Sequence, residues 1–442
     1  MKQKTKIKQT EIGMIPEEWE VKSIDEVAEV VGGGTPSTKN PEYWDGDIAW
    51  ITPKDLSNFK FRYIARGERN ITEKGLENSN AKLLPEGTVL LTTRAPVGYV
   101  AIAKNNVSTN QGFRSLIPRD NVKAEFLFYL LKNNIGILKS NASGTTFGEL
   151  SGSRLKALRF AFPDVIEQHR IASILSSLDS KIELNQQMNK TLEEIAQAIF
   201  KRWFIDFEFP NENGEPYKSS GGEMVESELG MIPKGWYVDN LGKYVEVVKG
   251  CSYSSIDLKP SDTALVTLKS INRGGGFNRN GYKEYVGKYK DNQIVKEGDV
   301  LLAQTDLTQN GDVIGRPAFF HGETTYSKVI ASLDLQIIRP LNGFSKYFVF
   351  YLLDTDSFHE HALSHTNGTT VLHLDRNAVS EFRCIIPKND ILDQFDAVVS
   401  QILSLENNNL QEINYLTEIR DLLLPKLMTG KIRVPLGEQN VQ

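Results

Sequence analysis

The chain has 442 residues, more than one hydrophobic core usually holds, so we expect at least two domains. Its 40% hydrophobic and 24% charged residues are typical of a globular protein. We expect a cytoplasmic protein, because the sequence shows neither a signal peptide nor an apolar run of membrane length. Cys251 and Cys384 have no CxxC partner, which argues against a disulfide framework or a zinc ribbon. The net charge of −5 argues against a nucleic-acid partner, but residues 1–163 hold 23 basic and 18 acidic residues whereas residues 164–230 hold 6 and 13, an asymmetry that permits DNA binding by the first segment.

The first segment, residues 1–163 (domain 1), is expected to mix short strands, turns and helices. β-Branched and aromatic residues predict strands at Ile48–Thr52, Thr88–Thr92 and Tyr99–Ala103. The glycine-led run Gly32–Pro36 breaks regular structure, and Ala124–Lys132 is typical of a short helix. These features together predict an α+β domain.

The remaining chain predicts five further parts in order. A long helix (residues 164–204) leads into a linker (205–230) and a second α+β segment (231–388, domain 2), which contains a predicted short helix at Tyr347–Asp354. A second long helix (389–427) and a tail (428–442) complete the chain.

Both long helices carry apolar heptads, which predict a coiled coil. Position a of the first holds Ile171, Leu178, Asn185, Leu192 and Ile199, and position d holds Ile174, Met188 and Ile195, with Lys181 as the exception. In the second helix, position a holds Phe395, Ile402, Asn409, Leu416 and Leu423, and position d holds Val398, Leu405 and Ile419, with Glu412 as the exception. The two sets lie 224 residues apart, a whole number of heptads, so the register is the same.

One asparagine occupies the same a position in each helix, Asn185 and Asn409. A buried asparagine at position a fixes register at some cost in stability, so we expect the helices to pair with each other, antiparallel, with both asparagines near a pseudo-twofold axis. The alternative is two exposed polar residues. Asp164 and Asp390 are the expected N-caps.

The chain repeats itself. Glu11–Trp19 (EIGMIPEEW) returns as Glu228–Trp236 (ELGMIPKGW), and Phe126–Leu131 (FLFYLL) returns as Phe348–Leu353 (FVFYLL). The sequence between these landmarks differs freely, which predicts a shared scaffold with variable loops. The expected fold is α+β: two similar domains separated by an antiparallel two-helix coiled coil in a pseudo-twofold, cyclic repeat, with Leu427–Val434 meeting the N-terminal segment.

The predicted helices have the length of a molecular spacer. Forty helical residues span roughly 60 Å, the length of about 17 base pairs of B-DNA. Two similar domains held apart by such a rod would contact one face of a duplex at two separated places.

Several segments resemble the specificity subunit of type I restriction–modification systems, over nearly the whole chain. The most specific are Trp203–Tyr217 followed by Gly221–Pro233, which resemble the family's central join, and Leu422–Val434, which resembles its C-terminal end. Gly33–Ser37, Trp50–Leu56 and Arg94–Gly98 resemble landmarks of a first target-recognition domain. Domain 2 departs from them: Lys249–Ser254 stands for the glycine-led loop, and Thr305-Asp306 for Thr93-Arg94.

The resemblance implies a non-catalytic DNA reader. Domains 1 and 2 would be target-recognition domains, each reading one part of a bipartite asymmetric site, and the helices would dock two modification subunits that methylate adenine with S-adenosylmethionine. Restriction subunits would bring ATP and Mg, so no cofactor or metal is expected in this chain.

DNA binding requires cations and hydroxyls for phosphates, and arginine, lysine or amides for base edges. Base readers are expected where the two copies differ. The candidates in domain 1 are Thr35, Ser37, Thr38, Lys39, Lys54, Arg94, Asn110, Gln111, Arg114, Ser143, Thr145 and Thr146. Those in domain 2 are Lys249, Ser252, Tyr253, Lys269, Asn272, Arg273, Arg316, Lys328, Thr369 and Thr370.

Catalytic motifs are missing. Asn40–Tyr43 (NPEY) lacks the second proline of an amino-methyltransferase loop, and no GxxxxGK[ST] phosphate loop is present. The histidines His359, His361, His365 and His373 match no zinc spacing. Two rival functions stay open: a stand-alone methyltransferase or nuclease, and a coiled-coil scaffold that does not bind DNA. The aromatic run Trp203, Phe204, Phe207 and Phe209 either docks a partner or packs on the second repeat.

Overall fold

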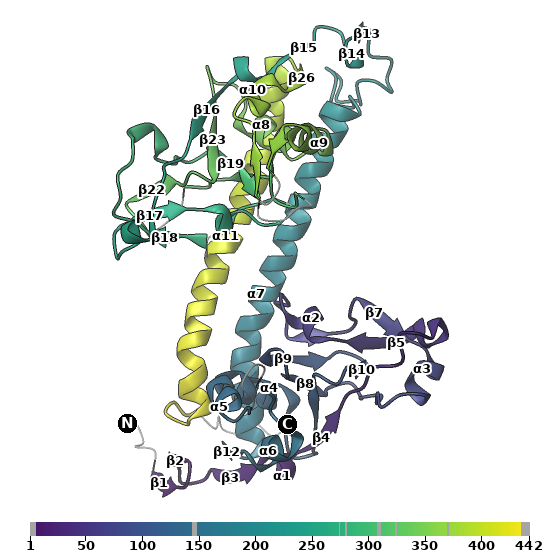
Figure 1. Cartoon of the computed structure of the whole chain (residues 1–442), viewed down its shortest axis with the longest axis vertical. Helices are drawn as coiled ribbons and strands as arrows, with labels where there is room; N and C mark the ends of the chain where they lie inside the picture. Colours follow the sequence, from purple (N-terminus) through teal and green to yellow (C-terminus); the bar gives the residue numbers. More distant parts are fainter. Residues whose placement is uncertain are drawn as a thin grey trace. The chain divides into compact units, whose positions relative to one another are not determined.

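The computed structural model describes residues 6–143, 148–273, 275–278, 281–306, 311–322, 325–368 and 371–434. The chain forms two compact units: unit 1 is Met1–Gln187 with Asn409–Gln442, and unit 2 is Met188–Asn408. The boundary crosses both long helices, so each unit holds one domain and one part of each helix (Figure 1). No helix in the described ranges is long and apolar enough to cross a membrane.

Unit 1 is built on two main sheets. The first has the strand order β4 (Ala28–Gly32), β11 (Arg114–Pro118), β8 (Val89–Thr93), β9 (Val97–Ala103), β6 (Tyr63–Ile64), and the second the order β10 (Val107–Thr109), β5 (Trp44–Ile51), β7 (Arg69–Ile71). Two strand pairs complete it, β1 (Ile7–Thr10) with β2 (Gly13–Pro16) and β3 (Glu20–Ser23) with β12 (Arg159–Phe162). Its short helices are α1 (Ile24–Val27), α2 (Pro53–Leu56), α3 (Glu73–Glu77), α4 (Ala124–Asn133), α5 (Ile135–Ser140) and α6 (Gly152–Ala157).

Unit 2 repeats this plan. Its sheets have the orders β16 (Val245–Lys249), β23 (Leu335–Pro340), β19 (Val300–Ala303), β21 (Pro317–Phe319), and β18 (Lys283–Glu284), β17 (Thr263–Val266), β22 (Lys328–Ala331). Smaller sheets join β13 (Met224–Ser227) to β14 (Gly230–Pro233), β15 (Tyr237–Asn240) to β26 (Arg383–Ile386), and β20 (Thr305–Asp306) to β25 (Leu372–Leu374) and β24 (Thr366–Asn367). Its short helices are α8 (Lys346–Leu353), α9 (Asp356–Ser364) and α10 (Ala378–Glu381).

The predicted elements of both domains are present. Strands β5, β8 and β9 overlap the three predicted strands of domain 1, and α4 and α8 overlap the two predicted helices, with ends that differ by no more than two residues except at the earlier start of β5. The segment predicted as a linker contains β13, which pairs with the repeated GMIP strand β14 exactly as β1 pairs with β2. The α+β duplication is therefore confirmed at the level of strand pairing.

The long helices are α7 (Val165–Phe200) and α11 (Asn389–Met428). In unit 1 their contacts pair Asp179 with Arg420 and Asn185 with Glu412, so the residue numbers rise on one helix as they fall on the other. Unit 2 shows the same direction, since Asn189 bonds the carbonyl oxygen of Glu406 and Phe200 packs on Phe395. Within each unit the two segments are therefore antiparallel, as expected.

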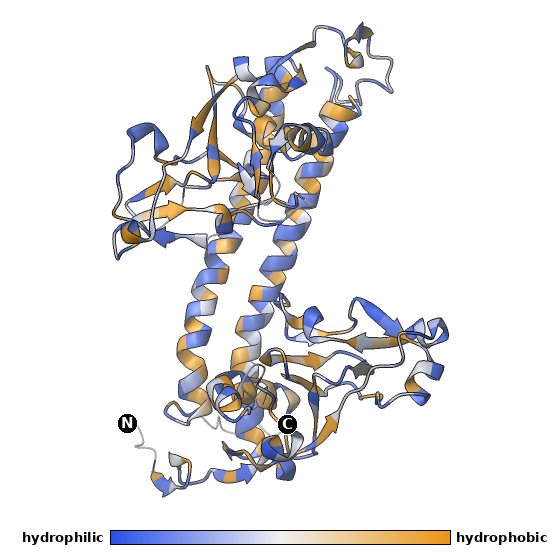
Figure 2. Ribbon diagram, viewed as in Figure 1, coloured by the Kyte–Doolittle hydropathy of each residue, from blue (hydrophilic) through white to orange (hydrophobic). Residues whose placement is uncertain are grey.

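The predicted d positions were wrong. Ile174, Met188 and Ile195 are 36%, 43% and 44% exposed, and Val398, Leu405 and Ile419 are exposed as well. The residues that are buried next to position a lie one residue after each predicted d position, at Leu175, Ile182, Asn189 and Ala196 on α7 and at Val399 on α11. The heptad pattern left apolar residues on both sides of position a, and packing decided which side is covered. Figure 2 shows hydrophobic residues, in orange, recurring along both helices.

The asparagine prediction holds in part. Asn185 is fully buried, and its Nδ2 donates to Glu412 Oε2 at 2.8 Å rather than to Asn409, which is partly buried. Asp164 is an N-cap, because its Oδ1 accepts the Glu167 N–H. Asp390 is not: the first backbone bonds of α11 run to the Lys388 carbonyl, so Asp390 lies inside the first turn.

The C-terminal segment closes unit 1 on the N-terminal segment, as the cyclic repeat predicts. Arg433 lies 2.7 Å from Glu18 and 2.8 Å from the buried Glu167, whose other oxygen accepts the Trp19 indole N–H. Leu427 and Met428 share the core of domain 1. The first and last described segments of the chain are thus packed into one unit.

Candidate nucleic-acid interface

Three loops of unit 1 meet at one end of its sheets and form an open groove of about 440 Å³. They follow β5, β8 and β10, and they supply the lining residues Thr52, Pro53, Lys54, Arg94, Ala95, Asn110, Gln111 and Gly112. Thr52 holds the first loop, since its backbone N–H and its hydroxyl both donate to Asp55 Oδ2 at 2.7 and 2.6 Å. Four of the residues predicted to contact DNA therefore line one groove.

The glycine-led loop packs against the same groove. Gly34 N donates to the Thr109 carbonyl at 2.9 Å, and a Cβ on Gly33 would lie 2.1 Å from the Asn110 carbonyl oxygen. Only glycine permits so close an approach of two backbones. The loop brings Thr35 to the groove, where its hydroxyl hydrogen-bonds Gln111 Oε1.

The groove offers cationic and amide groups to solvent. The Arg94 and Gln111 side chains are exposed, and the partly buried Asn110 uses its Oδ1 to accept the Gly112 N–H. Lys54 lies 2.6 Å from Glu68, and this hydrogen bond raises the pKa of the lysine above its usual value. Arginine and amide side chains are the groups that read guanine and adenine edges.

The other candidates of domain 1 lie outside this lining. Ser37, Thr38 and Lys39 are exposed in the continuation of the glycine-led loop, and Ser143 is exposed at a backbone bridge to Glu149. Arg114 is partly buried and lies 3.6 Å from Glu149. Thr145 and Thr146 fall outside the described residues.

The equivalent position in unit 2 is defined by the same backbone bonds. Cys251 N donates to the Ala331 carbonyl as Gly34 N does to Thr109, and Ser332 N donates to Val266 as Asn110 N does to Ile51. A Cβ on Gly250 would lie 2.0 Å from the Ser332 carbonyl oxygen, the same constraint as at Gly33. Residues Ser252, Lys269, Ser332 and Leu333 therefore correspond to Thr35, Lys54, Asn110 and Gln111.

These bonds also correct one predicted equivalence. Gln304 N donates to the Asp334 carbonyl as Thr93 N does to Gly112, so Gln304-Thr305, and not Thr305-Asp306, replaces Thr93-Arg94. Asp306 is buried and accepts the N–H groups of Val313 and Ile314. The predicted equivalence is therefore wrong by one residue.

The groove-equivalent loops of unit 2 have a different character. Lys269 is exposed, as Lys54 is. Thr305 is 8% exposed and lies 3.3 Å from Asp334, and the fully buried Ser332 hydroxyl lies 3.3 Å from the other oxygen of the same carboxylate. Leu333 is 38% exposed.

The remaining candidates of domain 2 are spread more widely. Lys249, Ser252, Asn272 and Arg273 are exposed, and Tyr253 lies 5.3 Å beneath the Lys283 ammonium. Lys328 begins β22, at the far end of the strand from Ser332, with its ammonium 3.3 Å from the Tyr289 hydroxyl. Thr369 and Thr370 fall outside the described residues.

Arg316 lies in a separate cavity of about 530 Å³ beside α7. Burial and the nearby Glu193 carboxylate raise the pKa of Asp354, another lining residue, to about 7, while Arg316 opposes that rise. Gln197 Nε2 donates to Asp354 at 3.2 Å. Arg316 thus lines the same cavity as an acidic side chain whose pKa it lowers.

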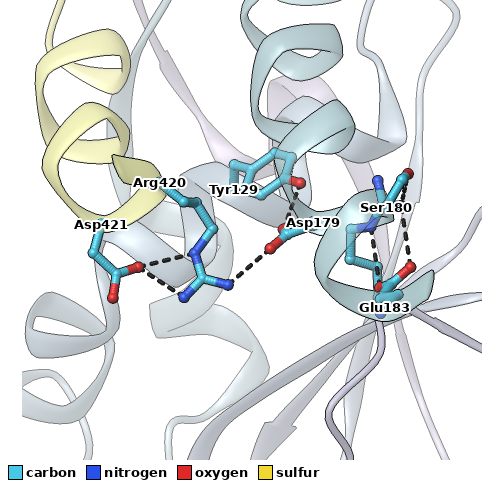
Figure 3. A network of polar contacts seen from close by, with 7 residues as sticks. Tyr129, Asp179, Ser180, Glu183, Arg420 and Asp421 are labelled. Atoms are coloured by element: carbon cyan, nitrogen blue, oxygen red, sulfur yellow. Dashed lines mark hydrogen bonds and ion pairs between the residues drawn. The ribbon is translucent and has the colours of Figure 1, made fainter. Parts of the chain in front are cut away.

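A polar network joins domain 1 to the long helices within unit 1 (Figure 3). The Asp179 carboxylate lies between the Tyr129 hydroxyl and Arg420, each at 2.7 Å. One turn along α7, Glu183 accepts the backbone N–H and side chain of Arg62. Sequence patterns gave no sign of this network, because its members lie on four distant segments.

The histidines and aromatic residues of unit 2 serve packing. His361 Nε2 lies 2.9 Å from the Ala378 carbonyl, and burial lowers the pKa of this imidazole. In the described ranges no group of three or more His, Cys, Asp or Glu is placed to hold a metal ion. Phe204, Phe207 and Phe209 are buried around Trp236, so the run packs on the second repeat, the second of the two alternatives.

Comparisons with known proteins agree with this architecture. A family model described as type I restriction modification DNA specificity domain matches residues 16–194. The chain is 38% identical to the type I restriction enzyme MjaIX specificity subunit of Methanocaldococcus jannaschii, with 97% of each chain covered. It is 27% identical to the HindI specificity subunit of Haemophilus influenzae, over 87% of this chain and 94% of that one. The crystal structure of a type I S subunit from M. genitalium aligns with a TM-score of 0.58 at 18% identity, over 96% and 99% of the two chains, and so has the same fold.

Proposed function

The chain belongs to the family of type I restriction enzyme specificity subunits, non-catalytic subunits that carry no cofactor, and from this membership we propose that it reads a bipartite, asymmetric DNA site. Each target-recognition domain contacts one half-site through the loops around the Gly33 and Gly250 approaches. The observation that carries the proposal is the convergence of Thr35, Lys54, Arg94, Asn110 and Gln111 on one groove of unit 1.

The site would be asymmetric because the groove of unit 1 and the equivalent loops of unit 2 share a frame and differ in their side chains. Both retain a glycine at which a Cβ would clash with the neighbouring backbone. Both also retain an exposed lysine in the equivalent loop. Arg94 and Gln111 are replaced by Thr305 and Leu333. A lysine contacts phosphate without reading sequence, whereas the exchanged residues would contact bases.

The uncovered helix residues fit partner subunits. Ile174, Met188, Ile195, Val398, Leu405 and Ile419 (the outer stripe) are large apolar side chains left exposed on both long helices. Apolar helix faces of this kind mark protein interaction sites. Two modification subunits would bind there, one on each repeat, bringing S-adenosylmethionine, and restriction subunits joined through them would bring ATP and Mg.

The long helices would set the distance between the two half-sites. The unread gap then depends on helix length, and the bases read depend on the loops.

The test is methylome sequencing of a host that expresses this chain with its modification subunit, together with salt-dependent footprinting of the purified complex. We expect methylated adenines in one split motif and affinity that falls as salt rises. Arg94→Ala should relax one half-site, whereas Arg66→Ala, an exposed arginine of the same domain outside the groove lining, should not. Absence of sequence preference would reject the specificity role, and methyl transfer by this chain alone would favour a stand-alone enzyme.

A further inference from the structure

We propose that Leu333 determines specificity in domain 2 by contacting the 5-methyl group of a thymine in the major groove. The inference rests on the proposed function, because it requires that the groove-equivalent loops of unit 2 face DNA. It assigns this half-site an apolar mode of recognition, in contrast to the polar groove of domain 1.

Leu333 occupies a fixed position. It follows Ser332 at the end of β22, and its N–H donates to the Cys251 carbonyl at 2.7 Å. Gly250 holds the same two loops close together, because a Cβ at this position would lie 2.0 Å from the Ser332 carbonyl oxygen. The side chain is thus presented from a rigid backbone at the place where domain 1 presents Gln111.

The Thr305 and Ser332 side chains near Leu333 are turned inward, whereas Ser252, the counterpart of Thr35, is exposed. Thr305 and Ser332 are 8% and 0% exposed, and both hydroxyls lie 3.3 Å from oxygens of Asp334. Buried hydroxyls held by a carboxylate cannot also bond a base edge. Lys269 is exposed, but a flexible point charge is suited to phosphate.

Leu333 is therefore an exposed apolar group, in the same set of loops as the exposed Lys269 and Ser252. Leaving a leucine 38% exposed gains nothing for folding, and its counterpart is a polar glutamine. The major groove presents one apolar group, the thymine 5-methyl, and a leucine contact with it distinguishes thymine from cytosine and from uracil.

The experiment measures binding of the complex with its modification subunit to duplexes carrying the motif found by methylome sequencing. Each thymine of the domain 2 half-site is replaced in turn by deoxyuridine, which removes only the methyl group. At one position we expect about fourfold weaker binding by the wild type, the value of burying one methyl-sized group. Leu333→Ala should bind both duplexes equally, and Leu333→Gln should shift the preferred base at that position alone.

Leu341→Ala is the matched control, since Leu341 is 37% exposed and follows the opposite end of β23; it should retain the uracil effect. Uracil in the domain 1 half-site should give no Leu333 dependence. Three outcomes would each overturn the inference. Uracil could weaken binding equally in the wild type and in Leu333→Ala, the domain 2 half-site could contain no thymine, or Leu333→Ala could lose binding to the modification subunit. Absence of any sequence preference in the wild type would instead reject the proposed function.

Discussion

Replacing Asp179 by leucine should destabilise unit 1, and a second substitution should reverse most of the loss. The Asp179 side chain is 6% exposed and holds both the buried Tyr129 hydroxyl and Arg420. In unit 2, Leu403 and Ala196 occupy the positions of Asp179 and Arg420, at an offset of 224 residues, and Tyr351 occupies that of Tyr129, at an offset of 222. Among the described residues the Tyr351 hydroxyl has no hydrogen-bond partner. Unit 1 thus fills this position between the helices with a charged pair, whereas unit 2 fills it with apolar side chains.

The magnitude follows from what each variant leaves unpaired. Asp179→Leu removes the buried one of the two carboxylates of Arg420, which keeps Asp421 at 2.8 Å; breaking a buried pair in this way costs about 3 kcal/mol. The Tyr129 hydroxyl loses Asp179 in the single and the double variant alike, so it does not distinguish them. Asp179→Leu with Arg420→Ala reproduces the unit 2 arrangement and should lie within about 1 kcal/mol of wild type, because apolar replacement of a buried pair is close to neutral.

The assay is native-state hydrogen exchange of α4 and α7 amides, which reports the opening free energy of unit 1 separately from that of unit 2. Amides of α8 provide the internal control and should not change. A single variant that loses less than about 1 kcal/mol, or a double variant as unstable as the single, would refute the reasoning.

Three further predictions follow from the same contacts. Leu405→Glu in the outer stripe should weaken modification-subunit binding at least tenfold at unchanged melting temperature, as measured by calorimetry, whereas Asn408→Glu, an exposed polar position on the same helix, should not. Asp354 has a folded-state pKa raised to about 7, so ionising it opposes folding: Asp354→Asn should leave stability nearly unchanged near pH 4 and raise it by about 4 kcal/mol at pH 8, with the gain appearing between those pH values in urea titrations, and an equal gain at both would contradict the assignment. Inserting seven residues into both α7 and α11 should lengthen the unread gap of the methylated motif and leave both half-sites unchanged; altered half-sites with the old gap would disprove the spacer.

Much of the candidate site could be predicted because it is encoded in short segments. Gly33, Thr35, Lys54, Arg94 and Gln111 each lie in a recognisable turn, and turns at the ends of neighbouring strands converge. Arg114 and Arg316 are arginines of the same chemical type, yet they lie beside acids at Glu149 and Asp354. Sequence does not distinguish an arginine that reads DNA from one that neutralises an internal carboxylate.

The sequence alone determined the duplication, the long helices and the position of Asn185 in their seam, because helical period and repeated words are local properties. The tertiary structure decided which side of position a is buried, since spacings of three and four residues are both apolar here and the contacts of each unit cover only one. It also decided the register that aligns Leu333 with Gln111, because that alignment is defined by backbone hydrogen bonds between strands far apart in the chain. The proposed specificity of domain 2 therefore depends on a correspondence that sequence similarity did not reveal.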